Sequence, residues 1–557
     1  MSQPSRARLA LVAVLLLGFA ARLSVFTWQA PFTPHHPDEA ILSQESLALW
    51  EGITPREVGW PASTTRLLFS SAHALAWLAD DARGIAQRHD AAHAMGAVAA
   101  WVGHHYVDTT DLYRIDRAIA VALGALQLLA AAWAFARWTG AAGTLIGTLA
   151  MAIAPMPVEY SQYMLADMTG ALFATLILGL AARPTPAAVV AMGALAGLAA
   201  ASKVHFGIWL LTPVLCVVLH PHAFRERRLQ TVAAGVAAMV LVFLLLVPWL
   251  WTNPFLALKE FAGVVAVKIS GTGRGRDVFG NLGAIFGGLG WLMLGGAAIG
   301  LVAFATRARR ALPVVIPTAL GTLALATSSI VFDRYGLVLV PGIGLLAAVG
   351  WDALLTTDRR ERKLVAGGLV TVMTLLTALA LVRAQQVAGE ADVDVQTTAW
   401  IRAHIERGRR IARHDEDNTY LPRTPQQLRA CAEAPLGASA YAHKLQVVGW
   451  AENEDGGPSP SMPMQLAVMN DELFRAYWCR RELTARTGDA GFELVAYHNE
   501  PRFGAVLERD VLADFRSGET GQTGGVDVLI TNRPVDVGRE PAATFHTARG
   551  QRLVYIR

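Results

Sequence analysis

Two adjacent carboxylates, Asp38 and Glu39, follow the first apolar stretch of the chain, in the run His35-His36-Pro37-Asp38-Glu39. A carboxylate near a membrane surface is costly to desolvate, so such residues usually have a function. General-base chemistry on a hydroxyl group would suit Asp38, with Glu39 beside it. The alternative is that both acids cap a helix that begins at Ala40, because Asp and Glu favour a first helical turn.

A third acid, Asp167, ends the short polar segment from Glu159 to Asp167, which also holds Tyr163. The topology argued below places this segment on the same side of a membrane as Asp38. Two carboxylates from different loops could orient a hydroxyl group or hold a metal ion. Alternatively, Asp167 is the N-cap of the apolar helix that follows, and one residue can do both.

Four side chains that carry nitrogen lie at the ends of apolar stretches that the topology argued below places outside the membrane. They are Arg117, Lys203, His205 and Arg334. A fixed cation in this position suits a phosphate group at the lipid surface. Snorkelling of long side chains is the alternative. Because basic residues are disfavoured on the outer side, we expect each to have a partner. For Arg334 that partner could be Asp333, in a structural ion pair.

The cofactor is left open. The histidines His35, His36, His104 and His105 could bind a divalent metal, but their spacing is not convincing for a ligand set, so metal dependence stays open. Of the three cysteines, Cys216 lies in an apolar stretch and suits packing. Cys431 and Cys479 lie in the polar tail, where a disulfide between them is one of two open possibilities.

The composition predicts a polytopic membrane protein. Of the 557 residues, 53% are hydrophobic and only 17% are charged, whereas soluble proteins carry nearer a quarter. Mean hydropathy is +0.37. The apolar residues form runs close to the length that spans a bilayer. Eleven spans are expected: Leu9–Trp28, Ala118–Phe135, Ala142–Pro157, Met168–Ala181, Ala187–Ala201, Phe206–Leu219, Val232–Trp251, Leu282–Ala305, Leu312–Phe332, Gly336–Leu355 and Leu364–Val382.

The basic residues set the expected orientation. Lys and Arg gather in cytoplasmic loops, and Arg6 and Arg8 therefore place the N-terminus inside. With eleven spans, the other basic clusters all fall on that side: Arg137, Arg183, Arg225/Arg227/Arg228, Arg307/Arg309/Arg310 and Arg359/Arg360/Arg362/Lys363. The pI near 9.0 is then explained by cytoplasm and lipid headgroups, and nucleic acid is not an expected partner.

The remaining segments are expected outside the membrane. In the outer loop 30–117, Ala40–Trp50 and Thr65–Leu78 are amphipathic and predict helices that lie in the bilayer interface. Residues 384–557 alternate strand-like and helical runs, which predicts a soluble C-terminal α/β domain beside the membrane domain 1–383. Its strand-like runs are Leu445–Val448, Phe492–Tyr497, Val526–Ile530 and Leu553–Ile556, and its helical runs are Val395–Arg407 and Met469–Arg486.

In order and topology, these residues resemble the polytopic GT-C glycosyltransferases, in particular the dolichyl-phosphate-mannose-protein mannosyltransferase and aminoarabinose-transferase group. The resemblance covers most of residues 1–410. It rests on Pro37-Asp38-Glu39, Tyr113…Arg117, Pro155…Tyr160-Ser161…Asp167, Ser202-Lys203, Phe332-Asp333-Arg334-Tyr335…Pro341 and Ala399-Trp400-Ile401-Arg402. The sequence departs from the pattern at Trp60–Thr65, where many bacterial relatives have a Pro-Pro-Leu-like stretch.

The resemblance implies transfer of a sugar from a polyprenyl-phosphate donor to an envelope acceptor (protein, lipid or polysaccharide) at the outer face of the bacterial inner membrane, with inversion. It implies that Asp38 is the base and that Asp167 is the acid of the second outer loop. Lys203 and Arg334 match basic positions near the donor phosphate. His205, Arg117 and Tyr163 complete the expected substrate-binding set.

Two other classes of function are compatible with a polytopic chain. A transporter or flippase of a lipid-linked saccharide would place charged or helix-breaking sites near the middle of the membrane, within matching halves. Here the notable charges gather at one face, and the halves do not match. A non-catalytic membrane anchor that presents the C-terminal tail would make Asp38 replaceable.

Overall fold

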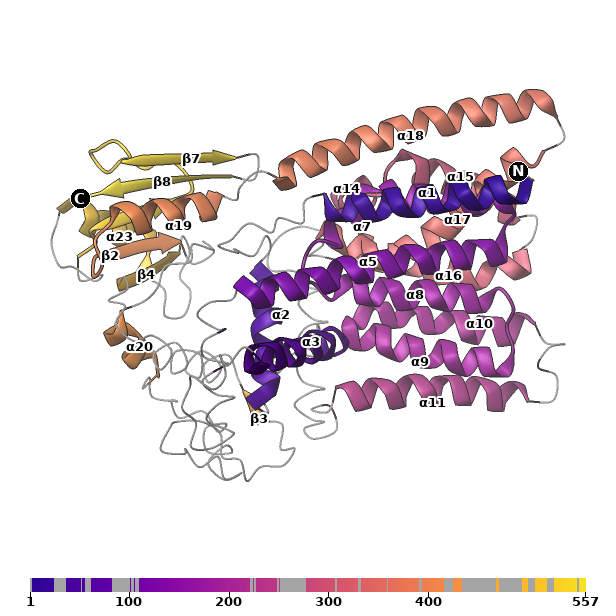
Figure 1. The fold of residues 1–557 in the computed structure, drawn as a ribbon, viewed down its shortest axis with the longest axis horizontal. Coiled ribbons are helices and arrows are strands. Elements are labelled where there is room, and N and C mark those ends of the chain that lie inside the picture. The colour runs from indigo at the N-terminus through magenta and orange to yellow at the C-terminus, as the bar shows by residue number, and fades with distance from the viewer. Residues whose placement is uncertain are drawn as a thin grey trace. The chain divides into compact units, whose positions relative to one another are not determined.

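The computed structural model describes residues 3–24, 37–51, 53–55, 62–82, 101, 105, 110–220, 224, 227–247, 250, 277–305, 308–328, 332–357, 359–389, 393–414, 424–432, 467–469, 493–498, 506–517, 525–547 and 550–557. The chain divides into two compact units (Figure 1). Unit 1 comprises Met1–Thr27, Arg56–Ala72 and Ile115–Gln386. Unit 2 comprises Trp28–Pro55, His73–Arg114 and Val387–Arg557.

Unit 1 is mostly helical. Its helices are α1 (Gln3–Leu23), α5 (Thr110–Trp138), α6 (Ala141–Ile153), α7 (Pro155–Tyr160), α8 (Asp167–Ala181), α9 (Pro186–Ser202), η3 (Val204–Leu210), α10 (Leu211–Leu219), α11 (Arg228–Leu246), α14 (Val278–Gly287), α15 (Trp291–Ala305), α16 (Ala308–Ala326), η4 (Asp333–Val338), α17 (Val340–Leu355) and α18 (Arg360–Gly389). The first turns of α5 belong to unit 2, and α3 (Ser63–Ala82) also has residues in both units.

Each of the eleven apolar segments expected from the sequence overlaps one of these helices or a helix pair. Within the described residues, α5, α11 and α18 contain stretches long and apolar enough to cross a membrane, and the bent pair α14 and α15 would add a fourth span. The remaining apolar helices α6, α8, α9, α16, α17 and the η3–α10 pair are shorter. Unit 1 is therefore a bundle of several apolar helices, as the composition predicts.

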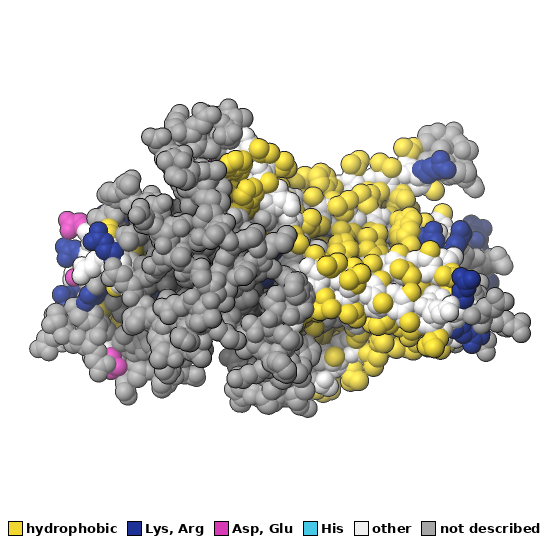
Figure 2. Space-filling model, turned by 90° about the horizontal axis from the view of Figure 1, so that it is seen from below, with side chains coloured by type: hydrophobic (Ala, Val, Ile, Leu, Met, Phe, Trp, Pro, Cys, Tyr) yellow, Lys and Arg dark blue, Asp and Glu magenta, His cyan; other side chains and the backbone are white. Residues whose placement is uncertain are grey.

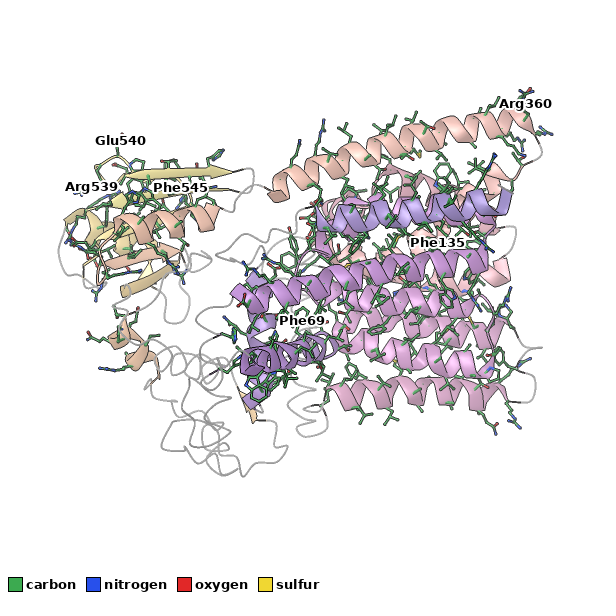
Figure 3. The ribbon with its side chains drawn as sticks, viewed as in Figure 1. Phe69, Phe135, Arg360, Arg539, Glu540 and Phe545 are labelled. Atoms are coloured by element: carbon green, nitrogen blue, oxygen red, sulfur yellow. The ribbon has the colours of Figure 1, made fainter. Side chains whose placement is uncertain are left out.

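Small residues allow close helix crossings in this bundle. A Cβ atom on Gly193 of α9 would collide with the carbonyl of Gly235 in α11, and one on Gly350 of α17 would collide with Gly296 in α15. Helices without large side chains at the crossing can bring their backbones together, which is the usual basis of packing in membrane proteins. Phe135 of α5, labelled in Figure 3, fills the space beside Gly147 of α6.

The segment predicted as one span at Leu282–Ala305 is two helices. The axes of α14 and α15 differ by 111°. The break falls at Gly288–Gly290, where Gly290 has φ +78°, a conformation that favours glycine. The freed backbone groups find new partners, because Met156 N–H donates to Gly288 O and Leu292 N–H donates to Thr377 Oγ1.

The two ends of the bundle differ in charge. Arg137 Nε donates to Gly179 O at 2.8 Å, which places this arginine at the C-terminal end of α8. Gly179 lies about 18 Å from Asp167 along α8, given a rise of 1.5 Å per residue. Figure 2 shows Lys and Arg side chains gathered at one end of the apolar surface, and Arg360 at the start of α18 is labelled in Figure 3. Asp167 therefore lies at the opposite end from Arg137.

Unit 2 contains a six-stranded sheet of order β5-β4-β2-β6-β8-β7. The four strands β5, β4, β2 and β6 are parallel to one another. Strand β8 is antiparallel to both β6 and β7. The elements of this unit are α2 (Pro37–Ala48), η1 (Leu49–Glu51), β1 (Ile53–Pro55), α19 (Val393–His404), β2 (Arg410–His414), α20 (Pro425–Ala432), β3 (Ala467–Met469), β4 (Glu493–His498), β5 (Val506–Leu507), α23 (Glu508–Ser517), β6 (Val528–Thr531), β7 (Ala543–Thr547) and β8 (Gly550–Ile556). A parallel pair, β1–β3, stands apart from the sheet.

The alternation of side chains along the strands gives the sheet two buried faces. Ile411, Val528 and Val554 pack with Ile401 of α19 on one face. The neighbouring strand residues Ala412, Leu529, Leu553 and Tyr555 pack with Val511 and Phe515 of α23 on the other. Phe545, labelled in Figure 3, makes an edge contact with Trp400 of α19, 6.4 Å between ring centroids. A sheet covered on both faces by helices results.

Several element predictions for this region are confirmed. The predicted strands at 492–497, 526–530 and 553–556 overlap β4, β6 and β8, and the predicted helix at 395–407 overlaps α19. The predicted strand at 445–448 lies outside the described residues. So does the predicted helix 469–486, apart from Met469, which ends β3.

Candidate functional site

A buried ion pair joins two of the predicted site residues. Lys203 Nζ lies 2.6 Å from Asp167 Oδ1, and the residues are 5% and 1% exposed. Asp167 begins α8 and Lys203 follows the last residue of α9, and these two helices pack together. Because they run antiparallel through a short connection, the start of one meets the end of the other. Loss of either partner would leave a buried charge uncompensated.

Tyr335 lies beside both basic side chains of the site. Lys203 Nζ lies 4.6 Å from the centroid of the Tyr335 ring, and Arg334 Cζ lies 5.9 Å from it. The His205 ring centroid is 5.4 Å from the same ring. An aromatic face attracts cations, so this ring favours two positive charges held close together. Asp167, Lys203, His205, Arg334 and Tyr335 are called the Asp167 cluster from here on.

The Asp167 cluster carries a positive balance. Arg334 and His205 both interact electrostatically with the Asp167 carboxylate. Lys203 and Arg334 contribute two positive charges against one negative charge, a net of +1 with His205 neutral. Among the residues that the structure describes, Asp167 Oδ2 is buried and accepts no hydrogen bond. The cluster can thus attract an anion and offer one carboxylate oxygen to a hydroxyl donor.

Two tyrosines on and after α7 extend the site. Tyr163 Oη donates to Glu159 at 2.9 Å, and Tyr160 Oη donates to Asp333 Oδ1 at 2.6 Å. Burial, and then the hydrogen bond to Asp333, raises the pKa of the Tyr160 hydroxyl well above its usual range. The hydroxyl therefore keeps its proton and remains a donor. The predicted partnership of Asp333 with Arg334 includes a backbone contact, since the Arg334 N–H donates to Asp333 Oδ1 at 2.8 Å.

The start of α3 is fixed to the helix ends that carry the ion pair. Ala62 N–H donates to Ser202 O at 3.1 Å, and Thr65 Oγ1 donates to Thr169 Oγ1 at 2.8 Å. Ala62 has φ +45°, a left-handed conformation that is unusual for a residue with a Cβ atom. Ala62 and Thr65 belong to the stretch Trp60–Thr65 that the sequence comparison singles out, and these two residues contact the helix ends that carry the ion pair.

The remaining predicted residues lie as follows. Arg117 is buried on α5, at 3% exposure. Glu39 is fully buried in the first turn of α2, whose start at Pro37 also agrees with the capping alternative. The Asp38 backbone lies in the same turn, but its side chain is outside the described residues. The convergence of Asp38 with Asp167 therefore stays a prediction.

The described residues do not fit a metal centre. None of them form a group of three His, Cys, Asp or Glu side chains that could hold an ion. At the Asp167 cluster the carboxylate is already paired with Lys203, and a second cation there would be repelled. Of the four histidines considered as ligands, His105 packs 4.6 Å from the Trp101 ring, and His35, His36 and His104 are outside the described residues.

Cys216 is a buried free thiol, and the side chains of Cys431 and Cys479 are outside the described residues.

Sequence reasoning missed Tyr335 as a site residue. Its neighbours Asp333 and Arg334 had been singled out, and the signal that could have found it is the aromatic residue directly after a buried arginine. Sequence reasoning also treated Asp167 and Lys203 separately, as a carboxylate and a phosphate contact. The structure brings them together as one ion pair.

No protein-family model matches the chain, and no curated protein matches it. Among solved structures, the chain is similar to ArnT from Cupriavidus metallidurans in the apo state (17% identity, 75% of this chain and 84% of that chain covered, TM-score 0.49). It is also similar to the same protein bound to undecaprenyl phosphate (17%, 75% and 84%, TM-score 0.48). A third is the apo oligosaccharyltransferase of Archaeoglobus fulgidus (12%, 94% and 69%, TM-score 0.48).

These similar structures are of GT-C superfamily glycosyltransferases, the superfamily that the sequence motifs resemble.

Proposed function

We propose that this protein is a membrane glycosyltransferase that moves a sugar from a polyprenyl-phosphate donor to an envelope acceptor, with inversion at the anomeric carbon. The observation that carries the proposal is the Asp167 cluster, in which the buried cations Lys203 and Arg334 outnumber the one buried carboxylate, Asp167. The cluster lies at the end of the apolar bundle away from Arg137. An apolar bundle suits the polyprenyl chain, and a buried pair of cations suits its phosphate.

In the proposed reaction, the acceptor hydroxyl oxygen bonds to the anomeric carbon as the bond from that carbon to the phosphate oxygen breaks. The bonding electrons leave with the phosphate, whose growing negative charge Lys203 and Arg334 stabilise. Asp38 takes the proton of the hydroxyl group, with Glu39 beside it. One base is enough for a single displacement, whereas retention would need a carboxylate nucleophile as well.

Asp167 has two roles in this scheme. Through Oδ1 it holds the Lys203 ammonium group in place, since the two atoms are 2.6 Å apart. Through Oδ2 it can accept a hydrogen bond from a sugar or acceptor hydroxyl. We assign His205, Arg117 and Tyr163 to substrate binding as well.

The proposed setting is the bacterial inner membrane, crossed eleven times by residues 1–383, with the N-terminus in the cytoplasm. The gathering of Arg137 and Arg360 with other basic residues at one end of the bundle supports this orientation. The Asp167 cluster would then face outward, beside interfacial helices of the outer loop 30–117. Residues 384–557 would form the periplasmic α/β domain.

The test of this function compares envelope glycans from three strains by mass spectrometry. One strain has the natural gene, one lacks it, and one carries Asp38→Asn at normal protein levels. We expect one glycan or glycoconjugate to lose a sugar mass in the deletion strain and in the Asp38→Asn strain. Identical glycan masses in all three strains would reject the enzyme proposal.

A further inference from the structure

The side chains of Lys203 and Arg334 come from different elements, so something must fix the distance between them. Lys203 follows α9, whereas Arg334 and Tyr335 belong to η4, a 3-10 helix of six residues. Such a short 3-10 turn has few hydrogen bonds of its own. Phe332, which precedes it, provides no side-chain cap. The placement of η4 must therefore come from its neighbours.

One end of η4 is held by steric contact. A Cβ atom on Gly336 would lie 2.6 Å from the carbonyl oxygen of Ile285 in α14 and 3.0 Å from Met156 Cε of α7. The backbone of η4 therefore lies directly against both helices. Leu339 N–H donates to Gly336 O, and α17 continues from that point. This contact fixes the C-terminal half of η4. It does not involve the N-terminal half, which carries Arg334.

At the other end, one carboxylate oxygen accepts two hydrogen bonds. Asp333 Oδ1 accepts hydrogen bonds from the Tyr160 hydroxyl at 2.6 Å and from the Arg334 N–H at 2.8 Å. Tyr160 is the last residue of α7 and is 6% exposed, so it belongs to the packed part of the bundle. Hydrogen bonds to a charged acceptor are roughly twice as strong as neutral ones.

We propose that Tyr160 and Asp333 are positioning residues, which hold η4 so that Arg334 and the Tyr335 ring face Lys203. The inference rests on the proposed function, since it assigns the geometry of the same phosphate site. Neither residue touches the phosphate in this scheme. Tyr160 holds Asp333, Asp333 holds the Arg334 backbone, and the adjacent Tyr335 ring sets where the two cations meet.

The alternative is that the Tyr160 hydroxyl supports packing alone. In that case its loss would lower stability and leave the cations in place. Binding of undecaprenyl phosphate to the full-length protein in nanodiscs distinguishes the positioning role from the packing role. The variants are Tyr160→Phe, Asp333→Leu and Asp333→Asn, whose amide oxygen can still accept both hydrogen bonds. Tyr555→Phe is the matched control, because the Tyr555 hydroxyl accepts a backbone hydrogen bond within the sheet of unit 2 and Tyr555 contributes nothing to η4.

The positioning role predicts that Tyr160→Phe and Asp333→Leu weaken probe binding by about 5- to 20-fold. Asp333→Asn should recover most of the affinity, and Tyr555→Phe should leave it unchanged. Combining Tyr160→Phe with Asp333→Leu should weaken binding no further than either change alone, since both break the same link. Probe affinity within twofold of the natural protein for Tyr160→Phe would overturn the role.

Hydrogen–deuterium exchange tests the positioning role without any ligand. Tyr160→Phe should speed exchange of the Arg334 and Tyr335 amides, and Tyr555→Phe should not. Unchanged exchange in η4 would refute the role even if the probe fails to bind. Conversely, if Lys203→Gln and Arg334→Gln leave probe binding unchanged while η4 responds to Tyr160→Phe, the proposed function fails and the positioning of η4 stands.

Discussion

Aspartates at the two ends of the helical bundle illustrate two uses of the same side chain. At one end, Asp352 of α17 accepts hydrogen bonds from the N–H groups of Gly140 and Gly143, both at 3.1 Å, and so satisfies the start of α6. Each of its two carboxylate oxygens therefore accepts a hydrogen bond from a helix terminus. At the other end, Asp167 has one oxygen paired with Lys203 and one that accepts nothing from the described residues.

Structural and functional acids in a membrane bundle differ in the groups that their carboxylate oxygens contact. Asp352 is half-buried and meets backbone groups of a helix terminus, which every helix must satisfy. Asp167 is almost fully buried and meets side chains that carry charge and aromatic faces. A buried ion pair adds little net stability, so its presence is better explained by what it can bind.

The largest effect is expected at Asp38, where Asn keeps the shape of the side chain but removes the base. If Asp38 takes the proton of the acceptor, Asp38→Asn should slow sugar transfer by about 10²- to 10⁴-fold. The assay follows transfer by membranes of the natural and variant strains, at matched protein levels. A rate within threefold of the natural enzyme would assign Asp38 to the capping role instead.

The next effect concerns the ion pair. Lys203→Met leaves the buried Asp167 carboxylate without its partner and should destabilise the protein by about 3–5 kcal/mol. Asp167→Asn alone leaves the Lys203 charge near Arg334 and should also destabilise. The double variant Asp167→Asn/Lys203→Met should recover much of the loss, because no uncompensated charge remains. Thermal unfolding in detergent measures all three, and strictly additive losses would show that the pair is not coupled.

The smallest effect is expected at the other aspartate. Asp352→Asn weakens the acceptors for two N–H groups at the start of α6 and should cost about 0.5–2 kcal/mol, as for other helix caps. Binding of undecaprenyl phosphate should stay unchanged. Thermal unfolding and lipid binding on the same preparation provide both readings. A large loss of lipid affinity in Asp352→Asn would erase the contrast between the two ends.

The sequence was sufficient to find the apolar helices because long apolar runs and basic loops are local signals. The break at Gly288–Gly290 was not predicted. The sequence contains the glycines, but the apolar composition continues across them, so the segment looks like one span. The strands β4, β6 and β8 were also predictable from local pattern. The order of the sheet was not, since it depends on contacts between distant segments.

The sequence predicted which residues form the candidate site better than it predicted which of them contact one another. Asp167, Lys203, His205 and Arg334 were all chosen from their positions at helix ends, and the structure brings these four together. Their partners follow from how α8, α9 and η4 pack, which no local signal reports. Tyr335 and the hydrogen bond from Tyr160 to Asp333 were missed for that reason.

The most direct test of the central claim is the affinity of the purified protein for undecaprenyl phosphate in nanodiscs. The natural protein should bind the probe saturably, and Arg334→Gln and Lys203→Gln should each weaken binding by about tenfold or more, as expected for a lost charge-assisted contact. Asp352→Asn should bind like the natural protein. Equal affinity in all four proteins would contradict the claim that the Asp167 cluster holds a lipid phosphate.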